Sequence, residues 1–116
     1  MALINPGLYD LVCPQGASFD KTFTYTIGGT AVNLTGYTAA LQVRAYADSS
    51  TALVSLTNGS GIALGGTAGT IDVAISSTVT TGIDAGSYAY DLELYSGSTV
   101  TRLLQGAFNV TAEVTR

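Results

Sequence analysis

Apolar and polar residues alternate along most of this chain, with the period of two that is typical of strands with one buried face. The clearest alternation covers residues 88–94, where the large apolar side chains share one parity: Tyr88, Tyr90, Leu92 and Leu94. A similar pattern covers residues 37–45, and another covers residues 104–114. The last run is long enough to predict a bend or a β-bulge, and Gly106 is the expected position.

Short segments that contain glycine separate these runs and predict turns. Gly28-Gly29 indicates a hairpin, and Asn33-Leu34-Thr35-Gly36 predicts a second turn that ends at Gly36. Only residues 76–82 favour a single helical turn, which a serine at its start would cap and a glycine at its end would close.

The number and spacing of these segments predict the fold class. About seven to eight short strands separated by turns indicate an all-β protein, a single antiparallel immunoglobulin-like β-sandwich. We assign residues 8–116 to this domain and residues 1–7 to a short N-terminal arm. A length of 116 residues fits one domain and leaves no room for a second core.

The segment that leads into residues 88–94 resembles the tyrosine corner of such sandwiches. In that motif, the hydroxyl of a tyrosine near the start of a central strand hydrogen-bonds to the backbone a few residues upstream. Here Asp84 and Gly86 are expected to form the turn, and Tyr88 would supply the hydroxyl. Tyr90 stands where antibody domains have a cysteine, so we expect no inter-sheet disulfide.

Charged residues make up only 10% of the chain, well below the average of about 25% for globular proteins. Few charges are then available to keep strand edges apart, which favours a subunit covered by neighbours in an assembly over an isolated β domain. The net charge is −4 and no basic patch is concentrated anywhere, so we expect no nucleic-acid binding. No apolar run approaches the roughly 18 residues of a membrane helix, so we expect no membrane association.

The residues needed for enzymatic chemistry are scarce. The chain has no histidine and one cysteine, Cys13, which argues against zinc chemistry and against a catalytic triad. Asp91 and Glu93 lie two positions apart on one face of a strand, where a paired acid or one edge of a calcium site is an alternative to two solvated charges. We favour solvated charges, and we expect no enzyme activity, no metal and no cofactor.

A few side chains are candidates for contact with a partner protein. Arg44 and Arg102 are expected to point outward from strands in a chain with few cations, and arginine is enriched in interface cores. Tyr46 and Tyr95 are outward aromatic candidates, and Leu3 and Ile4 are the candidates in the arm. Ordinary solvation is the alternative for each of these side chains.

Several segments together resemble small structural proteins of tailed phages. They are Asn33-Leu34-Thr35-Gly36-Tyr37-Thr38, Ala40-Leu41-Gln42-Val43-Arg44, residues 88–94 and the ending Thr101-Arg102-Leu103-Leu104-Gln105-Gly106 with Glu113-Val114-Thr115-Arg116. The opening Gln15-Gly16-Ala17-Ser18-Phe19 and the Leu-Thr-Gly turn also resemble the N-terminal domain of the phage baseplate upper protein family. In that family, such a domain docks a receptor-binding apparatus onto the tail baseplate. Unlike those proteins, this chain is expected to end at the sandwich, without a coiled coil or C-terminal binding module. This expectation favours a free-standing adaptor, collar or decoration subunit over direct receptor binding.

The resemblance implies a non-enzymatic virion structural protein of the tail or baseplate, assembled in the bacterial cytoplasm, that attaches fibres or neighbouring subunits. Its expected partners are other baseplate, tail or capsid proteins, with several copies or a homo-oligomer in the assembly. A capsid decoration protein is the first alternative. A carbohydrate-binding or adhesin module is the second, and exposed aromatic side chains such as Tyr46 and Tyr95 would favour it.

Overall fold

A computed structural model describes residues 7–115 of the protein, so the predicted contact residues Leu3 and Ile4 lie outside the described part of the chain. The described residues form one short α-helix, one 3-10 turn and a series of strands. The helix is α1 (Ser77–Thr81) and the 3-10 turn is η1 (Gly66–Ala68). The strands are β1 (Gly7–Leu8), β2 (Leu11–Pro14), β3 (Phe19–Thr24), β4 (Thr26–Ile27), β5 (Thr30–Ala31), β6 (Thr38–Arg44), β7 (Ala52–Asn58), β8 (Gly61–Leu64), β9 (Thr70–Ile75), β10 (Gly86–Ser96) and β11 (Thr99–Thr111).

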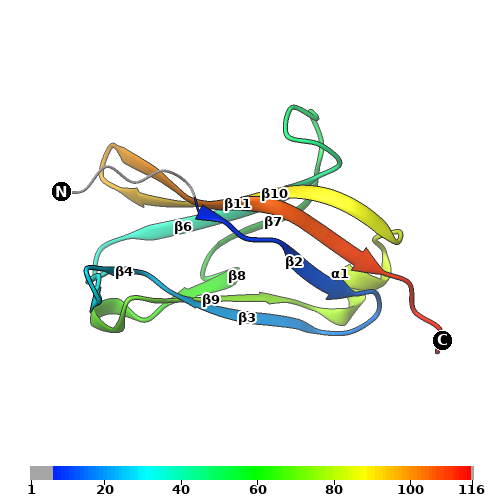
Figure 1. Ribbon diagram of the computed structural model, residues 1–116, viewed down its shortest axis with the longest axis horizontal. Coiled ribbons are helices and arrows are strands. Elements are labelled where there is room, and N and C mark those ends of the chain that lie inside the picture. The colour runs from blue at the N-terminus through cyan, green and yellow to red at the C-terminus, as the bar shows by residue number, and fades with distance from the viewer. Residues whose placement is uncertain (1–6, 116) are drawn as a thin grey trace.

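Most of these strands belong to one curled sheet. The strand order is β1-β11-β10-β6-β7-β8-β9-β3, with β2 also paired to β11, and β4 and β5 form a separate two-stranded ribbon. The sheet folds over between β7 and β8, so that β11, β10 and β6 face β8, β9 and β3 across the core (Figure 1). The prediction of an all-β fold is therefore confirmed.

The sheet is mixed, which corrects the prediction of a purely antiparallel sheet. Strands β1 and β2 both run parallel to β11, and β8 runs parallel to β7. Tight hairpin turns produce antiparallel neighbours, and these are the turns that glycine signals predict. Strands β1 and β2 come from the start of the chain and β11 comes from its end, so no turn connects them. Strands β7 and β8 are neighbours in sequence, but they run in the same direction and do not form a hairpin. The turn signals therefore determine neither of these pairings.

The irregularity of the last strand lies at Leu103 and not at the predicted Gly106. Leu104 pairs with Leu92, but Arg102 pairs with Glu93, so Leu103 is the extra residue of a bulge. Gly106 has a different role, because a Cβ at this position would lie only 2.5 Å from the main-chain oxygen of Tyr9. Glycine thus lets the segment between β1 and β2 pass close to β11.

The core lies between the two layers and follows the predicted alternation. In β6 the buried side chains are Ala39, Leu41 and Val43, and in β10 they are Tyr90, Leu92 and Leu94. Phe108 of β11 and Ile71 and Val73 of β9 are fully buried between these strands and the opposite layer. The outward residues of β6, β10 and β11 are therefore placed on a common outer face.

The predicted helical turn is present as α1 and closes one end of the core. The side chain of Ser76 caps it by accepting a hydrogen bond from the amide of Val79. Thr80 is completely buried, and its hydroxyl donates to the carbonyl oxygen of Ala17 at 2.8 Å while it accepts from the amide of Gly16 at 3.2 Å. These bonds attach α1 to the turn between β2 and β3.

Candidate functional site

The outer face of β6, β10 and β11 carries a groove with a volume of about 480 Å³. Leu8 of β1 lies at one side of it, and Ala47, in the loop between β6 and β7, lies at the other. The residues that line it are Leu8, Gln42, Arg44, Ala47, Ala89, Tyr90, Asp91, Glu93, Arg102, Gln105 and Gly106. Both arginines predicted as partner contacts therefore line one site.

Strand register explains why side chains from distant segments meet in this groove. Asp91 of β10 pairs with Gln42 of β6 on one side and with Gln105 of β11 on the other. The bulge at Leu103 shifts the register so that Arg102 stands opposite Glu93. Cross-strand neighbours of this kind lie close enough to interact, so the bulge creates the contact between this arginine and the acids of β10.

Arg102 joins the two acids at the centre of the groove. Its Nε lies 3.5 Å from Oδ2 of Asp91 and 3.9 Å from Oε2 of Glu93, and its Nη1 donates to Oε1 of Gln105 at 3.5 Å. The Arg102 side chain is 52% exposed, so these ion pairs are worth at most about 1 kcal/mol. Arg102 thus remains accessible to a partner, and losing it should not unfold the domain.

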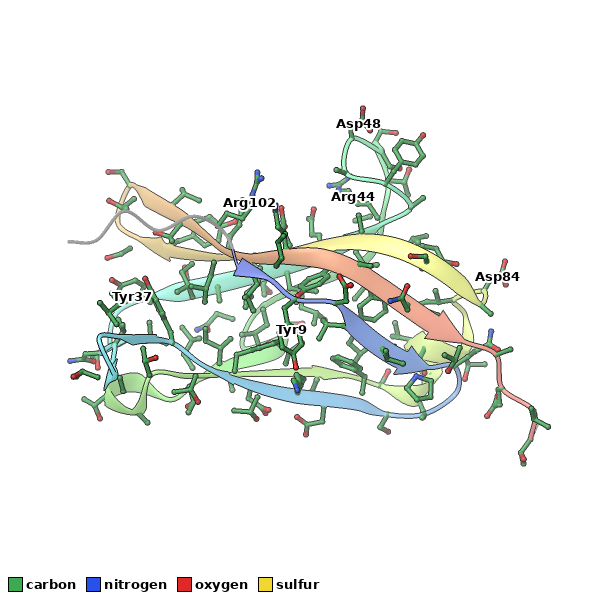
Figure 2. The ribbon with its side chains drawn as sticks, in the orientation of Figure 1. Tyr9, Tyr37, Arg44, Asp48, Asp84 and Arg102 are labelled. Atoms are coloured by element: carbon green, nitrogen blue, oxygen red, sulfur yellow. The ribbon has the colours of Figure 1, made fainter. Side chains whose placement is uncertain are left out.

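Arg44 supports the loop of residues 45–51 that rises beside the groove. Its Nη1 donates to the carbonyl oxygen of Ser49 at 2.7 Å, and its Nη2 donates to Oε1 of Gln42 at 2.7 Å. Figure 2 shows Arg44 at the base of this loop and Asp48 at its tip, with Arg102 on the same outer side of the layer. Tyr46 lies in the loop with its side chain 63% exposed, next to the groove but not in its lining.

Tyr95 belongs to the same polar cluster. Its hydroxyl donates to Oε1 of Glu93 at 2.7 Å, and this hydrogen bond is the main cause that raises the pKa of Tyr95 to about 12. Burial, followed by the charge of Glu93, raises the pKa of Asp91, while Arg102 and Arg44 act in the opposite direction. Asp91 and Glu93 are therefore paired with a cation and not simply solvated as predicted.

The groove is lined mainly by polar and charged side chains. Within residues 7–115, no three acidic, cysteine or histidine side chains converge into a group suited to a metal ion. Cys13 is buried in the core away from this groove, and burial raises the pKa of its thiol. What the groove presents is a pair of arginines, two acids and two amide side chains, a set suited to hydrogen bonding with another protein surface.

Sequence reasoning found some members of this site and missed others. Arg44 and Arg102 were predicted separately, and the structure brings them together in the groove lining, while Tyr95 is joined to the site through its hydrogen bond to Glu93. Gln42 and Gln105 were missed as site residues, although their outward parity is a signal that could have found them. Leu8 was also missed, and its 82% exposure shows only once β1 is placed on β11.

The residues predicted to form turns lie outside the groove. The hydroxyl of Tyr88 donates to the main-chain oxygen of Asp84 at 2.6 Å, which is the hydrogen bond expected of a tyrosine corner. Gly86 is the first residue of β10, directly after this turn. Gly36 adopts a positive φ of 84° in the turn before β6, a conformation that glycine adopts readily.

Comparisons with known proteins give no assignment to a family. No protein-family model matches the chain, and no curated protein matches it. Within residues 7–115, no helix has the length and apolar character required to cross a bilayer.

Proposed function

We propose that this protein is a non-enzymatic structural component of a tailed-phage virion, an adaptor in the tail or baseplate that attaches fibres or neighbouring subunits. The observation that carries this proposal is the groove on the outer face, which gathers Arg44 and Arg102 beside a raised loop with an exposed Tyr46. Arginine and tyrosine are the residue types that most often dominate protein–protein interfaces.

The proposed partner contact uses the whole outer face of β6, β10 and β11. Two of the four Lys and Arg residues of the chain line the groove, so the face combines rare cations with the acids of β10. Such a mixed pattern selects a partner of complementary pattern and disfavours others, because like charges brought together are repelled. Many copies in one particle would add avidity to a contact that is small in each copy.

We also propose that the fold is immunoglobulin-like. In that fold, strands A, B, E and D form one sheet and strands C, F and G form the other. The order β8-β9-β3 corresponds to D-E-B and the order β11-β10-β6 to G-F-C, with β7 in the position next to strand C. The N-terminal strands β1 and β2 pair with β11 instead of with β3. The Tyr88 hydrogen bond near the start of β10 supports the same assignment, because the tyrosine corner lies at the start of strand F.

Charge reversal in the groove tests the proposed docking face. The variant Arg102→Glu should fold normally but be incorporated poorly into particles of the phage or prophage that encodes the chain. Ser98→Glu is the matched control, because it adds an acidic side chain at the exposed turn between β10 and β11, outside the groove. Incorporation of Arg102→Glu at the level of the parent protein would show that this face is not the docking surface.

A further inference from the structure

The curled sheet ends at β3, which belongs to the layer opposite the outer-face groove. Among the described strands, β3 pairs only with β9, in an antiparallel ladder from Phe19 opposite Ile75 to Thr24 opposite Thr70. The other edge of β3 has no partner strand within residues 7–115, because β1 and β2 pair with β11 instead. An unpaired edge presents backbone donors and acceptors that another strand can use.

An apolar groove of about 340 Å³ lies directly beside this edge, between the two layers. Its lining is Tyr9, Phe23, Thr24, Tyr25, Thr26, Leu103 and Leu104. The rings of Tyr9 and Phe23 meet edge to face with centroids 5.7 Å apart, and Figure 2 shows Tyr9 between the layers. An apolar side chain from a strand added at β3 would enter this groove.

A single cation stands at the same edge. Nζ of Lys21 lies 5.2 Å from the centre of the Tyr9 ring, within the range of a cation–π contact. The ion pairs in residues 7–115 all involve Arg102, so Lys21 has no acidic partner within the described part of the chain. Within residues 7–115, this lysine therefore offers, beside the apolar groove, a positive charge that contacts the Tyr9 ring but no acidic side chain.

We propose that β3 and this groove bind an extended segment of a partner protein by strand addition. The segment that fits carries apolar side chains on alternate residues, one of which fills the groove, and a carboxylate that pairs with Lys21. Strand addition supplies affinity through main-chain hydrogen bonds and specificity through side-chain pockets, and the edge offers both. This surface is distinct from the outer-face groove, so the adaptor would hold two partners at once.

Synthetic peptides test the site without knowledge of the natural partner. The probe is a short peptide of alternating valine and threonine with one central glutamate, added to the folded full-length chain and followed by amide NMR shifts. We expect saturable shifts in Lys21, Thr22 and Phe23 and in the lining residue Leu104. A peptide methylated at alternate backbone nitrogens is the control, and it should not bind because it cannot donate to the ladder.

A charge exchange decides whether Lys21 selects the partner. Lys21→Glu should weaken binding of the glutamate peptide several-fold and should strengthen binding of a matched lysine peptide. Equal effects of Lys21→Glu on the binding of both peptides would contradict the proposal that Lys21 selects the partner by charge. They would mean that Lys21 only prevents other strands from pairing with the edge of β3. Shifts confined to other surfaces would overturn the site.

The remaining outcome concerns the start of the chain. Removal of residues 1–6 should leave peptide binding unchanged. Peptide binding that appears only after this removal would show that the chain fills the edge itself, and it would overturn the assignment to a partner. None of these results depends on Arg102. Strand addition at β3 can therefore be disproved while the proposal of docking through the outer face is retained.

Discussion

The hydroxyl of Tyr88 lies 2.6 Å from the main-chain oxygen of Asp84 and donates a hydrogen bond to it, which closes the turn that leads from α1 into β10. This bond fixes the start of the strand that contributes Asp91 and Glu93 to the outer-face groove. The turn that this bond closes lies next to the groove along the chain, because Ala89 and Tyr90, which follow Tyr88, line the groove.

Removing this hydroxyl should destabilise the domain. Tyr88→Phe keeps the ring but leaves the Asp84 oxygen without its donor, so we expect a loss of about 1 kcal/mol in the free energy of unfolding by urea. Tyr46→Phe is the control, because Tyr46 is exposed and has no hydroxyl hydrogen bond within the described residues. Equal stability of the two variants would show that the corner is not stabilising.

The loop of residues 45–51 should depend on Arg44. Arg44→Ala removes the donor to the Ser49 oxygen, so amide exchange in the loop should become faster while exchange in the core of β10 stays unchanged. Gln42→Ala is a useful comparison, because the side-chain hydrogen bonds of Gln42 go to the same guanidinium and to Ser55 of β7, not to the loop. Unchanged exchange in Arg44→Ala would mean that the loop is held by other contacts.

Gly106 should tolerate no side chain. A methyl group here would lie 2.5 Å from the main-chain oxygen of Tyr9, the atom that accepts the hydrogen bond from the Tyr90 hydroxyl. We expect Gly106→Ala to cost about 1–3 kcal/mol in urea unfolding, because backbone must move to make room. Gly82→Ala is the matched control, since the nearest atom to its new methyl lies at 3.5 Å. Similar losses in both variants would contradict the close approach.

Stability should fall in strong alkali. Burial, followed by the charge of Asp10, raises the pKa of Tyr90 to about 12 in the folded protein, whereas an unfolded tyrosine ionises near pH 10. Because the unfolded chain loses this proton first, the free energy of unfolding decreases as the pH rises from about 10 through about 12. Tyr95 acts in the same direction, because its pKa is also raised to about 12.

Urea titrations across this pH range check the effect. The free energy of unfolding of Tyr90→Phe should decline less steeply between about pH 10 and pH 12, and adding Tyr95→Phe should flatten the dependence further. At neutral pH, Tyr90→Phe should be less stable than the parent protein, because the Tyr9 oxygen loses its donor. If the free energy of unfolding depended on pH equally in the parent and the variants, Tyr90 and Tyr95 would be ruled out as the source of the alkaline loss of stability.

The sequence predicts local features well, because they depend on near neighbours. The alternation in β10 follows from the burial of Tyr90, Leu92 and Leu94, and the Ser76 cap of α1 follows from residues within one turn. The Tyr88 hydrogen bond spans only four positions, so its motif was visible in the chain.

Features that depend on distant segments were not predictable in the same way. Gly106 was recognised as special, but the reason is contact with Tyr9, which comes from the other end of the chain. The shared groove of Arg44 and Arg102 depends on the strand order around β10 and on the bulge at Leu103. Alternation assigns each side chain a face, but it does not determine the neighbouring strand or the register.

Electron microscopy of particles labelled with an antibody to this protein tests the proposed function most directly. Tail-tip or fibre-base label is the predicted result, and it would direct attention to Arg44 and Arg102 as the docking contacts. Label spread over the head would contradict the tail adaptor and support a capsid decoration protein. Intact particles without any label would contradict a virion role altogether.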